Sequence, residues 1–135
     1  MSKKRKRYNK AHRTAGRKTK KWTKDNHHLC YTKRSWGGGV LSELRRFHYC
    51  IILIPKETLH KAIHKAVPTI PAPKWEIAKY ALEQLRMLEE IGAISANDSI
   101  EKRLVLLASL FANYRPTADG FIKQLEVVRK YNRPP

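Results

Sequence analysis

The sequence predicts a mostly helical α+β protein that carries an extended basic arm at its N-terminus. One short apolar run rich in β-branched residues lies among several stretches of helical periodicity. A proline-rich segment at 68–73 separates two parts of the body. We therefore expect an arm at 1–24, a small mixed core at 25–67, the linker at 68–73, and a three-helix region at 74–135.

The positive charge of the chain is concentrated in the arm. The 135 residues include 29 Lys and Arg against 11 Asp and Glu, for a formal net charge of +18. The arm has no acidic residue and almost no large apolar side chain, so it cannot form a core of its own. Such charge points to nucleic acid, DNA or RNA, with the arm either lying on phosphates or serving as a solubilising or targeting extension. The basic residues of the arm are Lys3, Lys4, Arg5, Lys6, Arg7, Lys10, Arg13, Arg17, Lys18, Lys20, Lys21 and Lys24.

Several classes of protein are disfavoured by composition. No run of about 18 apolar residues is present, so we expect neither a transmembrane helix nor a membrane partner. The N-terminal charges are not followed by the apolar segment of a secretory signal. Two cysteines are too few for a disulfide scaffold, so we expect a reducing, cytoplasmic location, in a host cell if a phage encodes the protein.

The first part of the body contains three expected elements in order. The segment 40–47 places its apolar residues on one face and predicts a short helix. The run 49–54 reads as a strand that Pro55 ends. A second helix is expected over 56–67, where apolar residues recur every fourth position until Pro68 stops it.

The second part is expected to form three helices. The first ends at Gly92, and the second begins at Asp98, with Glu101 three residues later as in a capping box. The third begins at Thr117, after Pro116. We expect the apolar stripes of these helices to form the core, and the region 74–131 to offer a surface for a protein partner. The stripes are Ile77, Ala81, Leu82, Leu85, Leu88 and Ile91; Ile100, Leu104, Leu107, Leu110, Phe111 and Tyr114; and Phe121, Leu125, Val128 and Tyr131.

Histidines are concentrated in the mixed core, where five of the six occur. His27 and His28 are adjacent, and His48 precedes the expected strand. His60 and His64 are four residues apart on an expected helix, so both imidazoles can face one cation. The alternative is that these residues are ordinary core and surface histidines of a basic binding domain.

The order of these features resembles the His-Me finger, or HNH-type, endonuclease family. A histidine pair is followed by the Gly-rich loop 36–39, a short strand, and a helix with the pattern His-x-x-x-His. This family has a ββα-metal core, and the resemblance covers residues 25 to 67. The short basic chain is also similar to proteins of phages and mobile elements.

The resemblance implies a role for each histidine. His28 looks like the general base that deprotonates the attacking water, and His27, His60 and His64 look like ligands of one divalent metal ion, Mg²⁺, Mn²⁺ or Zn²⁺. His48 takes the middle position that orients the base. The family usually has Asn at this position, and the sequence has no Asn between Asn26 and Asn97.

These roles together predict a metal-dependent endonuclease that hydrolyses phosphodiester bonds. Arg34, Arg45 and Arg46 are expected to bind flanking phosphates. Trp36, beside the glycines, is expected either to anchor the loop or to stack on a base.

Two alternatives remain open at the level of sequence. A closed zinc site could combine Cys30 and Cys50 with His60 and His64, although buried hydrophobic cysteines are favoured because the sequence lacks a Cys-x₂₋₄-Cys knuckle. The protein could also be a non-catalytic binder of nucleic acid or nucleoprotein on a degenerate nuclease scaffold, such as a phage or mobile-element inhibitor of an RNA-guided nuclease (anti-CRISPR type). The missing Asn favours that second alternative.

Overall fold

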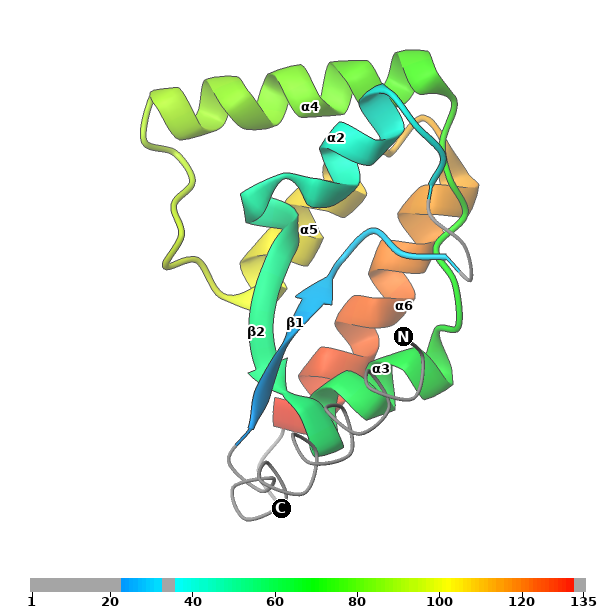
Figure 1. Cartoon of the computed structure of the whole chain (residues 1–135), viewed down its shortest axis with the longest axis vertical. Coiled ribbons are helices and arrows are strands. Elements are labelled where there is room, and N and C mark those ends of the chain that lie inside the picture. The colour runs from blue at the N-terminus through cyan, green and yellow to red at the C-terminus, as the bar shows by residue number, and fades with distance from the viewer. Residues whose placement is uncertain (1–22, 33–35, 133–135) are drawn as a thin grey trace, which may run out of the picture.

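The computed structural model describes residues 23–32 and 36–132, and it has the mostly helical α+β architecture expected from the sequence (Figure 1). No helix in these ranges is long and apolar enough to cross a membrane. The described elements are β1 (Lys24–His28), α2 (Val40–Arg46), a 3₁₀ turn (His48–Cys50), β2 (Ile51–Pro55), a π-helical turn (Lys56–His60), α3 (Lys61–Ala66), α4 (Trp75–Glu90), α5 (Ile100–Leu110) and α6 (Arg115–Asn132).

The two strands form a small antiparallel sheet that positions the histidine pair. His27 lies opposite Ile52 and His28 lies opposite Ile51. Because successive side chains of a strand point to opposite faces, the adjacent histidines face in opposite directions. His27 is fully buried, whereas His28 is only partly buried.

The second strand and the helix that follows it differ from their expected forms. The strand begins at Ile51 rather than at residue 49, because the backbone N–H of Cys50 donates to the carbonyl of Phe47 and closes a 3₁₀ turn. The helix expected over 56–67 begins with a π-helical turn, which α3 continues to Ala66. Short π-helical segments recur at functional sites, and this one ends at His60.

The start of α5 is capped by a different residue from the one expected. Ser99 is the N-cap, and its hydroxyl accepts a hydrogen bond from the backbone N–H of Lys102. Asp98 instead accepts hydrogen bonds from the Tyr49 hydroxyl and from the backbone N–H of Ser95. The prediction that Asp98 caps this helix was therefore wrong. Its carboxylate is hydrogen-bonded to Tyr49, which is distant in sequence, and Ser99 caps the helix instead.

The last helix begins two residues earlier than expected and exposes its final aromatic ring. α6 starts at Arg115, which places Pro116 in the first turn, where a missing N–H costs nothing. Tyr131 was expected in the core but is 46% exposed, and its hydroxyl donates to the hydroxyl of Thr58.

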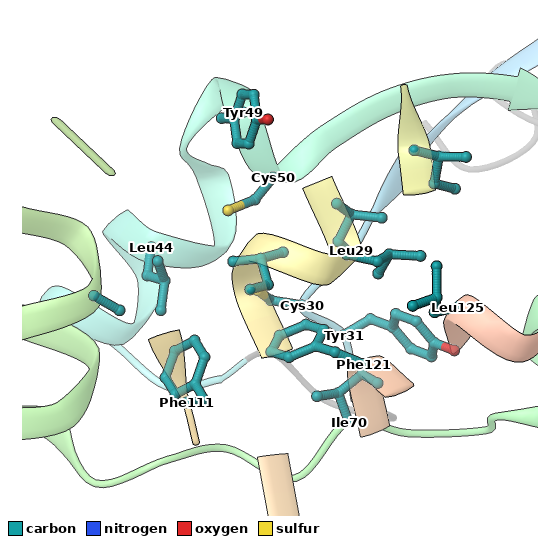
Figure 2. Close-up of a cluster of buried hydrophobic side chains, with 14 of the residues drawn as sticks. Leu29, Cys30, Tyr31, Leu44, Tyr49, Cys50, Ile70, Phe111, Phe121 and Leu125 are labelled. Atoms are coloured by element: carbon teal, nitrogen blue, oxygen red, sulfur yellow. The ribbon is translucent and has the colours of Figure 1, made fainter. Parts of the chain in front are cut away.

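One core joins the two parts of the body. Figure 2 shows Leu29, Cys30 and Tyr31 packed beside Phe121 and Ile70, which come from α6 and the proline-rich linker. The linker is therefore a packed part of the core, and α3 also packs on α6 (Figure 1).

The backbone of α6 approaches this linker closely at Gly120. A Cβ atom at Gly120 would lie 2.8 Å from Cδ1 of Ile70, which is closer than van der Waals contact allows. A glycine inside a helix costs about 1 kcal/mol relative to Ala, and here it makes room for the buried Ile70.

The contact between Asp98 and Tyr49 makes part of the stability depend on pH. The hydrogen bond from Tyr49 lowers the pKa of Asp98 to about 2. A carboxyl group whose pKa is lower in the folded chain stabilises the fold above its unfolded pKa of about 3.9. This stabilisation is lost as the pH falls toward 2.

We expect Asp98→Asn to lower the free energy of unfolding at pH 7, and the difference from wild type to shrink between pH 4 and pH 2. Urea unfolding between pH 2 and pH 7 measures the free energies of unfolding of the variant and of the wild type. Asp119→Asn is the matched control, because Asp119 is half-exposed and its ion pair within the described part of the chain is with Arg115 of its own helix. A difference for Asp98→Asn that stays constant down to pH 2 would contradict this assignment.

Candidate metal centre

Three of the predicted ligands converge in the structure. One ring nitrogen from each of His27, His60 and His64 lies within 4.8 Å of the others, and this cluster could hold a metal ion. Nε2 of His60 and Nε2 of His64 are 3.0 Å apart. Tetrahedral coordination with metal–nitrogen bonds of about 2.0–2.1 Å requires nitrogens about 3.3 Å apart, so His60 and His64 are already close to this spacing, whereas His27 must approach them on metal binding.

The cluster is built from the two-stranded sheet and the helical segment that follows β2. His27 extends from the buried face of β1, and the π-helical turn with α3 presents His60 and His64 one turn apart. The ring centroids lie 4.6 to 5.1 Å from one another. The cluster therefore combines β1, which pairs with β2, with the helical segment that directly follows β2.

His27 is the buried member of the cluster. Its side chain is fully buried, and this burial lowers its pKa to about 3, so the ring is neutral at pH 7. Nε2 lies 2.5 Å from Oε1 of Gln124 on α6, whereas Nδ1 has no hydrogen-bond partner among the described residues. An unpaired buried polar atom costs about 1–3 kcal/mol, and a bound cation would supply the missing partner.

The other two histidines connect the cluster to solvent. Nδ1 of His60 lies 3.7 Å from a carboxylate oxygen of Asp25, which leaves Nε2 facing His64. His64 is exposed, and its ring lies 4.4 Å from that of Tyr31. Partial burial, followed by the charge of His60, lowers the pKa of His64 and favours the neutral form that binds metals. Of the three histidines, His64 is the one that is exposed to solvent.

His28, the expected general base, lies beside the cluster rather than within it. Partial burial lowers its pKa, and the positive charges of Arg45, Arg46 and His60 lower it further. Two of these charges belong to the basic last turn of α2 and one to a member of the cluster. Within residues 23–32 and 36–132, the imidazole ring of His28 forms no hydrogen bond.

His48 does not take the position expected for it. Its Nε2 atom pairs with a carboxylate oxygen of Glu89 at the end of α4, and its ring lies against Phe47. The side chain is 58% exposed. The 3₁₀ turn at His48–Cys50 directs His48 toward α4, so the structure does not bring it to His28.

The residues expected to bind nucleic acid divide into three groups. Arg46 and Lys24 are exposed, and Arg45 is half-buried with its Nε atom unpaired among the described residues. Trp36 is 2% exposed and donates to the carbonyl of Ile70, so it anchors the loop and cannot stack on a base. Outside the described residues lie Arg34 and the arm residues Lys3, Lys4, Arg5, Lys6, Arg7, Lys10, Arg13, Arg17, Lys18, Lys20 and Lys21.

The cysteines do not join the histidines. Cys30 and Cys50 are free thiols that are fully buried in the core (Figure 2). Burial raises the pKa of Cys30, which disfavours the thiolate that a zinc ion needs. The metal-binding group found within the described ranges contains only histidines, so the alternative Cys₂His₂ site is not formed.

A surface hollow of about 480 Å³ lies apart from the cluster. It opens between α2 and α4, where Glu43, Trp75 and Arg86 contribute to its walls. None of the histidines lines it, so the candidate chemistry and this hollow are separate.

Comparison with known proteins identifies no matching protein family, no matching curated protein and no matching solved structure. The candidate site is therefore interpreted from its own residues.

Proposed function

We propose that the protein is a metal-dependent endonuclease that hydrolyses phosphodiester bonds of DNA or RNA. One observation carries the proposal: His27 on β1 converges with His60 and His64 from the helical segment after β2. The sequence contains these histidines in the order found in His-Me finger nucleases, and the cluster is open to solvent at His64.

The ligand set favours zinc among the three candidate ions. Imidazole nitrogens suit Zn²⁺, whereas Mg²⁺ and Mn²⁺ prefer oxygen ligands. A divalent ion held by the three imidazoles supplies positive charge that stabilises a phosphate and the departing 3′-oxygen. Asp25 beside His60 and Gln124 beside His27 would orient two of the ligands.

The remaining steps belong to the side chains around the cluster. In this proposal His28 accepts a proton from the attacking water, since an imidazole of lowered pKa is unprotonated at pH 7. Arg45 and Arg46 bind phosphates beside it, and the basic arm adds affinity that does not depend on base sequence. The buried free thiols are consistent with a cytoplasmic location.

A cleavage assay tests this function. Purified protein is incubated with plasmid DNA and with single-stranded RNA in the presence of Mg²⁺, Mn²⁺ or Zn²⁺. We expect cleavage that requires the ion, and we expect His28→Ala to reduce its rate by about 10²- to 10⁴-fold.

The matched control is His48→Ala, which removes an exposed imidazole that pairs with Glu89. We expect this variant to keep the wild-type rate within about twofold, since surface changes away from a site have small effects. Equal loss in both variants would contradict the role of His28. Absence of cleavage with every ion and both substrates would contradict the proposal that the protein is an endonuclease.

A second candidate function is non-catalytic binding of nucleic acid or nucleoprotein, including inhibition of an RNA-guided nuclease. The placement of His48 favours it, because His48 pairs with Glu89 instead of orienting His28. In that case the helical region 74–131 would bind a protein partner. Metal binding and tight nucleic-acid binding without cleavage in the same assay would support this function.

A further inference from the structure

We propose that Gln124 is a positioning residue that holds His27 as its Nε2–H tautomer, so that His27 binds the metal ion through Nδ1. The inference rests on the metal centre of the proposed function, but not on nuclease activity. Gln124 lies on α6, 97 residues from His27 in the sequence, and both side chains are fully buried.

The orientation of the Gln124 amide follows from its second contact. Its Nε2 atom donates to the backbone carbonyl of Leu29 at 3.3 Å. The reversed amide would place its oxygen against that carbonyl, where neither atom can donate. The amide oxygen of Gln124 must therefore face His27.

This orientation decides which nitrogen of His27 carries the proton. An amide oxygen can only accept, so Nε2 of His27, at 2.5 Å from it, must be the donor. A neutral imidazole has one N–H, and Nδ1 then keeps a lone pair. Nδ1 is buried and has no hydrogen-bond partner among the described residues, as expected for an atom whose lone pair binds a cation.

The same arrangement explains why the helical region contributes to the site. Metal-binding histidines generally donate their second N–H to an acceptor that sets ring orientation, and loss of this acceptor typically weakens metal affinity about 10- to 100-fold. Here the acceptor comes from α6, on the other side of the proline-rich linker from His27. The two-stranded sheet and α3 without α6 would lack this acceptor.

Nitrogen NMR on the ¹⁵N-labelled full-length protein tests the tautomer directly. In the metal-free protein we expect the chemical shifts of a protonated Nε2 and an unprotonated Nδ1 for His27. On addition of Zn²⁺, we expect the Nδ1 shift to move while Nε2 keeps its proton. A protonated Nδ1 in the metal-free protein, or zinc on Nε2, would overturn the proposal.

Substitutions of Gln124 test its role by zinc titration. Gln124→Leu should weaken zinc binding by about 10- to 100-fold and abolish the single tautomer, whereas Gln124→Glu keeps an acceptor and should bind within about threefold of wild type. The matched control is Gln84→Leu on α4, which should bind as wild type does. Unchanged affinity and tautomer in Gln124→Leu would overturn the proposal.

The outcomes separate this inference from the proposed function. Should Gln124→Leu fail to fold, the spectra of wild type and Gln124→Glu still decide the tautomer. Wild-type protein that binds no zinc would overturn both the metal centre and the ligand role of Nδ1. Zinc binding through Nδ1 without any cleavage would support the inference and contradict the endonuclease.

Discussion

Adding Zn²⁺ to the metal-free protein is expected to raise its free energy of unfolding by about 2.7 kcal/mol when the free ion is about 100 times its Kd. The reason is that the proposed site would hold the ion between three imidazoles that only the folded chain brings together. For a chain of this size, the thermal midpoint should rise by about 10 °C. Calorimetry with and without a chelator measures the change.

The histidine variants make this prediction specific. His64→Ala removes one of the three ligands. We expect it to reduce the zinc-induced rise to less than about 0.5 kcal/mol, because loss of a direct ligand weakens zinc affinity more than loss of a residue that only orients a ligand. His48→Ala should keep the full rise, since His48 lies outside the cluster and pairs with Glu89. An equal rise in wild type and His64→Ala would mean that zinc binds elsewhere on the chain.

Replacing Arg103 with Met is expected to lower the free energy of unfolding by about 4 kcal/mol. Arg103 is 5% exposed on α5, and its guanidinium lies over the ring of Tyr49. Its nitrogens donate to the backbone carbonyls of Tyr49, Ile51, Ala96 and Asp98 at 2.8 to 3.2 Å. Met would fill the space but leave these carbonyls without their donor, and each unpaired buried group costs about 1–3 kcal/mol.

Two comparison variants test this explanation. Arg103→Lys should recover only about half of the loss, because an ammonium group cannot reach four carbonyls in a fixed fork. Arg86→Met removes an exposed guanidinium that pairs with Glu43 at 3.6 Å, so its effect should be below about 0.5 kcal/mol. Chemical denaturation of the three variants measures the differences. Equal effects at positions 86 and 103 would contradict the structural role of Arg103.

Arg103 also shows why periodicity finds a helix but not all of its contacts. The stripe Ile100, Leu104 and Leu107 predicts the buried face of α5, and all three are buried. Arg103 lies on the same face, yet a charged residue at such a position reads as solvent-exposed. Its burial depends on carbonyls at the start of β2, which are distant in sequence.

The sequence by itself determined the mostly helical character of the fold and the three histidines of the cluster that could hold a metal ion. Both are local properties, since the 3.6-residue repeat places His60 and His64 on one face, and a strand carries His27 toward the core. The tertiary structure alone decided the partners of these residues. Gln124 reaches His27 from α6, and His48 pairs with Glu89, because folding sets contacts between distant segments that no local spacing encodes.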